Sequence, residues 1–299
     1  MFFPVAGVTI NPLLLAGIGF VIGILGGFFG VGGGFLAGPM LFLSGVPMNY
    51  VIGTDLAHMM GNSLVATRRH RVLGHVDLKL GALMIAGTAA GVEAGAQIIE
   101  KLEASGNIDQ IVGGIYIVIL LIIAAFVAYE SVRALQLLHE DELPAKEALA
   151  YNSLHTQMRR VRIPPLVSLP ISGVEQISLW VILGVGFVTG LLSGILGVGG
   201  GFIRMPALVY FLGIPTHIAI GTDLFEIVFS AGYGTLTHAL KGNVDILIAL
   251  VMQTGAILGA QVGATSTRHV AGPKIRLVFS ALPVIGAALV FYRLLGGGR

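Results

Sequence analysis

The sequence predicts an all-α polytopic membrane protein made of two homologous repeats, each with about four or five helices. Only 11% of its residues are charged and 55% are hydrophobic, whereas about 25% of the residues in a soluble domain are charged. Long stretches carry no charge, and one glycine-rich motif occurs in each half of the chain. Together these observations favour a membrane protein with an internal duplication over a soluble enzyme or binding domain.

The duplicated motif has the same parts in both halves. The first copy reads GVGGGFLAGPML over 30–41 and is followed by GTD at 53–55. The second reads GVGGGFIRMPAL over 197–208 and is followed by GTD at 221–223. Two apolar halves that are interrupted by glycine and proline at the same place are typical of secondary transporters, whose binding site lies between the repeats.

The first repeat, residues 1–129, begins with a segment that is too long for one crossing. Residues 13–54 contain no charged side chain and would form roughly 63 Å of helix, about twice the thickness of the hydrocarbon core. The glycine block divides this region into three predicted helical pieces, at 13–29, 34–44 and 50–66. Two further crossings are expected, at 78–99 and 108–129.

Residues 130–177 form a charged linker, and residues 178–299 form the second repeat, with uncharged runs at 176–203, 246–267 and 277–292. Basic residues are enriched in cytoplasmic loops. The linker is rich in arginine, and Thr67–Arg71 is a second basic run, so both are expected on the cytoplasmic side.

The relative orientation of the repeats depends on how the glycine-rich segment crosses the membrane. Two crossings would give inverted repeats and one would give parallel repeats. Both arrangements place equal numbers of lysine and arginine residues inside, so the positive-inside rule does not decide. The length of the uncharged segment 13–54 favours inversion.

The glycine blocks are places where a helix can stop inside the membrane. Glycine adopts positive φ and leaves the backbone open to a ligand, and the helix that follows starts with N–H groups that favour an anion. The glycines could alternatively serve only close helix packing. The candidate substrate-binding residues at the two blocks are Gly32, Gly33, Gly34, Phe35, Gly199, Gly200, Gly201 and Phe202.

Ionisable residues in the apolar segments are expensive to bury and are usually functional. Asp55 and Asp223 occupy equivalent positions in the two GTD motifs, and His58 and Glu226 lie one helical turn further on. We predict that these four residues carry protons during transport. The alternative is that each Gly-Thr opens a helix, where Thr54 and Thr222 or the aspartates would act as N-caps. Both threonines are also candidate substrate ligands.

Arg204 is the most informative single residue, because the first repeat has Ala37 at the equivalent place. A guanidinium can bind a sulfonate or carboxylate with two parallel hydrogen bonds. The competing interpretation is a salt bridge from Arg204 to Asp55, Asp223 or Glu226. Asn62, one turn beyond His58, is a further candidate ligand, with a helix–helix hydrogen bond as its alternative role.

The repeated G-x-G-G-G-F, the proline about five residues later and the following G-T resemble the TauE/SafE family of sulfite and organosulfonate exporters. The resemblance covers 13–100 and 180–265. It implies an inner-membrane carrier for small sulfur-containing anions. The chain departs from the family pattern at Asp55 and Asp223, where serine or asparagine is frequent, and a carboxylate there would repel an anion unless it is protonated or paired.

Two other classes are considered. A channel or transporter for a divalent metal cation would use Asp55, His58, Met59, Met60, Asp223 and Glu226 as ligands. An intramembrane enzyme is disfavoured, because the sequence contains neither HExxH nor GxSG. No cofactor or metal is expected. The expected partners are the small anion and the lipid bilayer, with a homodimer as a candidate assembly and no nucleic acid.

Overall fold

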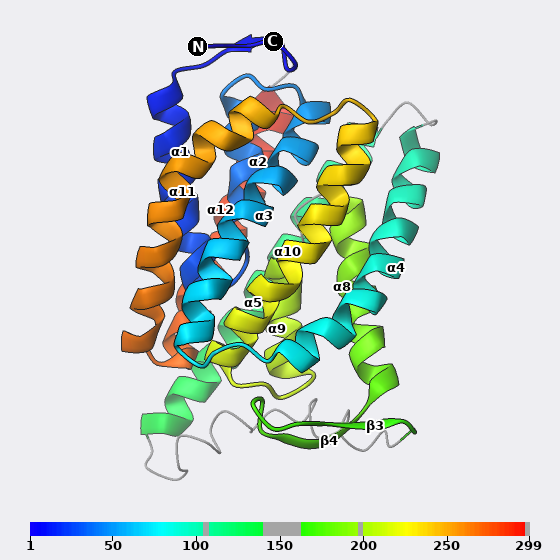
Figure 1. The fold of residues 1–299 in the computed structure, drawn as a ribbon, viewed down its shortest axis with the longest axis vertical. Coiled ribbons are helices and arrows are strands. Elements are labelled where there is room, and N and C mark those ends of the chain that lie inside the picture. The colour runs from blue at the N-terminus through cyan, green and yellow to red at the C-terminus, as the bar shows by residue number, and fades with distance from the viewer. Residues whose placement is uncertain (104–107, 140–162, 197–199, 297–299) are drawn as a thin grey trace.

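The computed structural model describes residues 1–103, 108–139, 163–196 and 200–296, and these are mostly helical (Figure 1). The helices in the first half are α1 (Pro12–Phe29), α2 (Gly34–Leu43), α3 (Met48–Val72), α4 (Leu78–Glu103) and α5 (Ile108–His139). Those in the second half are α8 (Leu179–Leu196), α9 (Gly201–Tyr210), α10 (Thr216–Leu240), α11 (Ile246–Ser266), the short 3-10 helix η1 (Thr267–His269) and α12 (Gly272–Gly296).

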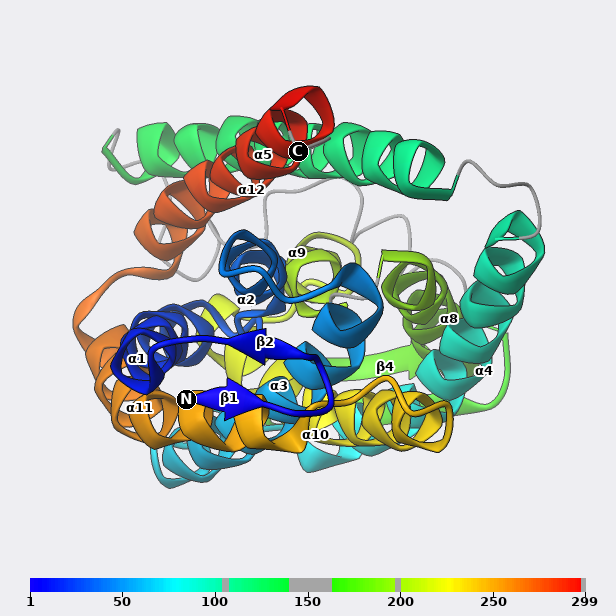
Figure 2. The same ribbon diagram turned by 90° about the horizontal axis from the view of Figure 1, so that it is seen from above.

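Helices of one half pack mainly against helices of the other. The most extensive pairs are α1 with α11, α4 with α8, α5 with α12, and α3 with α10. Seen from above, the short helices α2 and α9 lie in the middle, between the α1–α11 and α4–α8 pairs, with α5 and α12 crossing along one side (Figure 2). The two halves therefore share one bundle and are not separate domains side by side.

Glycines allow the closest of these helix pairs. A Cβ added to Gly91 of α4 would lie 2.1 Å from the carbonyl oxygen of Phe187 in α8, and one added to Gly190 of α8 would lie 2.4 Å from the carbonyl oxygen of Thr88. The α1–α11 pair repeats this, since a Cβ on Gly259 would lie 2.1 Å from the carbonyl oxygen of Phe20. Such small-residue contacts are typical of packed membrane helices, where no hydrophobic effect drives association.

Two antiparallel hairpins lie at opposite ends of the bundle (Figure 1). One is formed by β1 (Phe2–Phe3) and β2 (Val8–Thr9), before α1. The other is formed by β3 (Leu166–Leu169) and β4 (Val174–Ser178), before α8. Neither was expected from the sequence, which places 163–177 in the linker. We refer to the end that carries β3 and β4 as the linker-side end.

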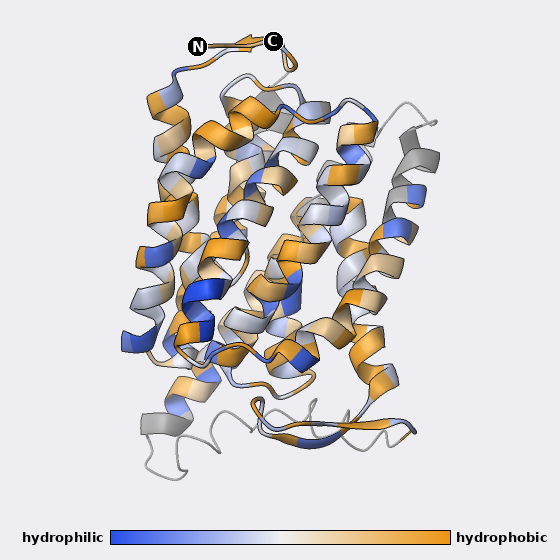
Figure 3. Ribbon diagram, in the orientation of Figure 1, coloured by the Kyte–Doolittle hydropathy of each residue, from blue (hydrophilic) through white to orange (hydrophobic). Residues whose placement is uncertain are grey.

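Among the described residues, four segments are long and apolar enough to cross a membrane: Pro12–Phe29, Ile117–Gln136, Ile246–His269 and Gly272–Leu289. Apolar residues cover most of the helix ribbons, and the lower end of α3 is hydrophilic (Figure 3). These features confirm the predicted all-α membrane protein. The predicted pieces at 13–29, 34–44 and 50–66 correspond to α1, α2 and α3, and α5 extends ten residues beyond its predicted end at 129.

Candidate functional site

The first glycine block interrupts the helix as predicted. Gly30, Gly32 and Gly33 have φ of 79°, 66° and 94°, values that a side chain makes unfavourable. Gly33 precedes α2, which begins at Gly34 and contains Phe35. Gly200, with φ of 75°, has the same role before α9, which begins at Gly201 and contains the buried Phe202. Gly199 lies outside the described residues.

Both breaks lie about halfway along the neighbouring helices. A Cβ on Gly33 would lie 2.2 Å from the Ile22 side chain, near the middle of α1, and one on Gly200 would lie 3.2 Å from the carbonyl oxygen of Thr189, near the middle of α8. A Cβ on Gly201 would lie 2.9 Å from the Cα of Val31, so the described parts of the two blocks touch. With ten residues each, α2 and α9 are about 15 Å long, half of the hydrocarbon thickness.

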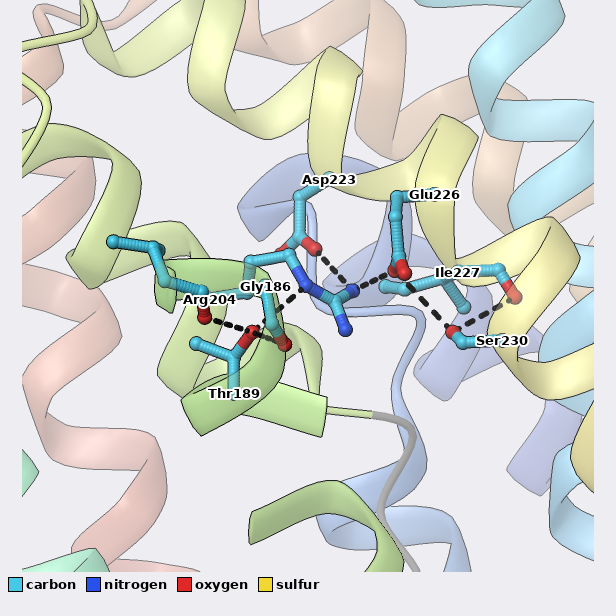
Figure 4. A network of polar contacts seen from close by, with 8 residues as sticks. Gly186, Thr189, Arg204, Asp223, Glu226, Ile227 and Ser230 are labelled. Carbon is cyan, nitrogen blue, oxygen red and sulfur yellow. Dashed lines mark hydrogen bonds and ion pairs between the residues drawn. The ribbon is translucent and has the colours of Figure 1, made fainter. Parts of the chain in front are cut away.

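Arg204 lies in the first turn of α9, next to the second break, and forms ion pairs with Asp223 and Glu226 of α10 (Figure 4). Its Nη1 is 3.0 Å from Asp223 Oδ1 and also contacts Glu226 Oε2. Its Nε donates a longer hydrogen bond of 3.4 Å to Thr189 Oγ1. The structure therefore contains the salt bridge that was the competing interpretation of Arg204.

The Arg204 cluster is closed to solvent but incompletely bonded. The side chains of Arg204 and Asp223 are fully buried and that of Glu226 is 1% exposed. Arg204 Nη2, Asp223 Oδ2 and Glu226 Oε1 have no hydrogen-bond partner. Buried polar atoms normally have partners, and two ionised carboxylates around one guanidinium leave an excess negative charge. The cluster is consequently suited to gain a proton or a ligand.

The equivalent place in the first repeat has different chemistry. Ala37 replaces the arginine, and Asp55 Oδ1 lies 3.8 Å from His58 Nδ1 on α3. Asn62 donates a hydrogen bond of 3.0 Å to the carbonyl oxygen of Gly32, which holds the first break against α3. Asp55, His58 and Asn62 are at most 1% exposed, and each retains an unpartnered polar atom. The two breaks thus touch, and each has its own group of candidate residues, but Arg204 is present in only one.

The alternative in which each Gly-Thr opens a helix is wrong. α3 and α10 begin at Met48 and Thr216, so both GTD motifs lie inside continuous helices. Each helix begins at the end of the bundle because the preceding proline, Pro47 or Pro215, has the extended backbone of an N-cap. Asp55 and Asp223 are therefore not N-caps.

The threonines of the GTD motifs instead contact the other repeat. Thr54 Oγ1 accepts a hydrogen bond of 2.9 Å from the backbone N–H of Asp245, and Thr222 Oγ1 accepts one of 2.9 Å from that of Asp77. Asp77 and Asp245 were not among the predicted site residues. The sequence feature that could have identified them is the pair of similar strings GHVD at 74–77 and GNVD at 242–245, each of which ends in an aspartate.

Thr189 and Ser230 were also missed. Ser230 Oγ donates a hydrogen bond of 3.3 Å to Glu226 Oε2, and Thr189 Oγ1 accepts a hydrogen bond from Arg204 Nε. Serine and threonine are common in apolar helices, where their hydroxyls bond to the preceding turn, as Thr189 does to Val185. Nothing in their spacing distinguishes these two from the others.

Buried charges at two mid-depth helix breaks, inside an apolar bundle, are features of a membrane transporter. Comparison with protein families agrees: residues 15–290 match the model described as "Sulfite exporter TauE/SafE". The chain belongs to this family, which consists of membrane transporters and not of enzymes. It is accordingly a multi-pass membrane protein.

Individual relatives extend over nearly the whole chain. "Probable membrane transporter protein YunE" of Bacillus subtilis is 27% identical over 93% of this chain and 97% of its own length. "Probable membrane transporter protein MJ0441" of Methanocaldococcus jannaschii is 23% identical over 91% of each chain. "Sulfite exporter TauE/SafE family protein 3" of Arabidopsis thaliana is 32% identical over 28% of this chain and 17% of its own length. No solved structure matches.

Proposed function

We propose that this protein is a secondary transporter of the cell inner membrane that exports small sulfur-containing anions, such as sulfite or organosulfonates. The observation that carries the proposal is Arg204, a buried guanidinium at mid-depth beside the start of a half-helix. A guanidinium matches the planar pairs of oxygens on a sulfonate or sulfite group. The family, which is named after sulfite export, supports the same class of substrate.

We further propose that the anion and the carboxylates of Asp223 and Glu226 compete for Arg204. In the ion-paired state Nη1 of the guanidinium is occupied, and an incoming anion would meet two like charges. Protonation of the carboxylates weakens their hold on Arg204 and lowers the repulsion, because a nearby like charge disfavours a second one. Substrate binding is thereby linked to proton uptake, and release of the protons on one side would drive transport.

The second proton-carrying group in this scheme is the Asp55–His58 pair. The pair lies on α3, which packs against α10. Because the first repeat has no counterpart of Arg204, we assign proton transfer to its Asp55–His58 pair and the cationic contact with the anion to the second repeat. Asn62 and the backbone at Gly32–Gly34 and Gly200–Gly201 complete the proposed anion site.

The transport scheme includes repeats of inverted topology. Three features support it: α1 starts at the upper end of Figure 1 and α8 at the linker-side end, α1 pairs with α11 as α8 pairs with α4, and Thr54 bonds to Asp245 as Thr222 bonds to Asp77. Alternation between two equivalent packings would then expose the site to one side at a time.

The divalent-cation alternative has less support. A cation would have to bind beside Arg204, and within the described part of the chain no group of three or more histidine, aspartate or glutamate residues is placed to hold a metal ion. Asp55 and His58 supply one pair. The anion proposal is therefore the one we develop.

The test is transport of labelled sulfite, an alkanesulfonate and a carboxylate by the protein in proteoliposomes. Arg204→Ala should abolish uptake, and Arg204→Lys should restore little of it, because lysine lacks the planar fork. Arg276→Lys is the matched control: Arg276 is also buried, at 2% exposure, but it bonds to Thr216 in another part of the bundle. A folded Arg204→Ala protein with unchanged anion affinity would overturn the binding role.

A further inference from the structure

Each β-hairpin packs on one end of the bundle. The side chains of Phe3, Ala6 and Ile10 are buried in an apolar cluster with residues of α1, α2 and α3. At the linker-side end, Leu169 and Val174 are buried in the cluster that contains the core residues of α9. The two hairpins thus pack on opposite ends of the bundle (Figure 1).

At the linker-side end, one aspartate joins three elements. The backbone N–H of Asp77 donates to Thr222 Oγ1 of α10, at 2.9 Å. Its Oδ1 accepts from the backbone N–H of Leu80 in the first turn of α4, at 3.1 Å, as an N-cap does. Its Oδ2 accepts from Ser172 Oγ, between β3 and β4, at 2.7 Å. We call this set of contacts the linker-side latch.

The same arrangement is found at the opposite end. The backbone N–H of Asp245 donates to Thr54 Oγ1 of α3, at 2.9 Å. Its Oδ1 caps α11 by accepting from Leu247 N and Ile248 N, at 3.1 and 3.2 Å. Its Oδ2 accepts from the backbone N–H of Ala6, between β1 and β2, at 3.1 Å. We call this set the N-terminal latch.

Each latch also reaches the central site. Thr222 directly precedes Asp223, and Thr54 directly precedes Asp55, so a helix movement that displaces the aspartate also displaces the threonine. The two aspartates of the latches are at most 1% exposed, as are the residues of the Arg204 cluster. Both latches and the Arg204 cluster are therefore closed to solvent in this conformation.

We propose that Thr54 and Thr222 are positioning residues that join the transport site to two hairpin gates, and that the access cycle opens one latch at a time. The linker-side latch opens the site to the linker side and the N-terminal latch opens it to the other. The proposal rests on the transport class of the protein and not on the identity of the anion, so it is tested without substrate.

The experiment uses the absence of cysteine from the chain. Ser63→Cys supplies a reporter thiol in α3: Ser63 is fully buried, its hydroxyl has no partner, and it lies beside the first break. In this background, Ser172→Ala removes the hairpin bond of the linker-side latch, and Thr54→Val removes the hydroxyl of the N-terminal latch. Ser178→Ala is the matched control, because Ser178 Oγ bonds to Ile163 and to neither latch.

The measurement is the rate at which a membrane-impermeant methanethiosulfonate modifies the reporter in vesicles of each orientation. We expect Ser172→Ala to raise the rate several-fold from the linker side only, Thr54→Val to raise it from the opposite side only, and Ser178→Ala to change neither. Equal increases from both sides would show general loosening, and unchanged rates would show that the latches do not control access; either result overturns the proposal. If Thr54→Val does not fold, the comparison of Ser172→Ala with Ser178→Ala tests the linker-side latch by itself.

Discussion

Loss of Arg204 should destabilise the protein strongly, and the cause should be the carboxylates that remain. Arg204→Met removes the guanidinium from Asp223 and Glu226, both buried. In the described part of the chain Asp223 then has no remaining side-chain hydrogen bond, while Glu226 keeps its contact with Ser230. Removing one partner of a buried ion pair costs about 3–5 kcal/mol, and here two carboxylates lose one cation, so we expect the upper part of that range.

The cost should be recovered when the carboxylates are neutralised. In Arg204→Met combined with Asp223→Asn and Glu226→Gln, no charge remains, so the cost of an uncompensated buried charge is removed. The assay is the unfolding midpoint of purified protein in one detergent, for the wild type, the single variant and the triple variant, at neutral and acidic pH. The difference in unfolding midpoint between the wild type and Arg204→Met should be smaller at acidic pH, because the carboxylates bind protons there.

One result would refute this reasoning. If the triple variant is as unstable as Arg204→Met, the loss comes from missing packing around the arginine stem and not from stranded charge. Transport should be absent from both variants, so stability and function separate: the triple variant should be folded and inactive.

Two further predictions concern the repeats. Gly190→Ala should lower the unfolding midpoint, because its Cβ would lie 2.4 Å from the backbone oxygen of Thr88 and overpacking costs about 1–3 kcal/mol. Gly184→Ala is the control and should have little effect, because no atom lies within 4 Å of its Cβ. Equal changes in the unfolding midpoints of the two variants would show that helix propensity dominates. Asp55→Asn and Asp223→Asn should differ in transport: the variant that loses the coupling proton should exchange anion across the membrane but fail to concentrate it. Wild-type, pH-dependent accumulation by both would place coupling elsewhere.

Much of the fold follows from local sequence. An uncharged stretch twice as long as the membrane is thick must turn back, and glycines with positive φ determine where, which is why the boundaries of α1 and α2 were predicted closely. The hairpins were not predicted, since β1 and β2 have two residues each and their stability comes from packing on the bundle. The predicted piece at 50–66 started two residues after the start of α3, and the GTD motif resembled a cap although Pro47 and Pro215 are the N-caps.

By itself the sequence determined that the protein is membrane-embedded, that one glycine motif occurs in each half, and that Asp55, His58, Arg204, Asp223 and Glu226 lie within its apolar segments. These are properties of composition and of local backbone preference, which need no knowledge of contacts. Only the tertiary structure decided the partners: Arg204 with both carboxylates of α10, and Thr54 and Thr222 with the aspartates of the opposite repeat. The reason is physical, because a buried charge needs a counter-charge within a few ångströms, and which one lies there depends on how helices from distant parts of the chain pack.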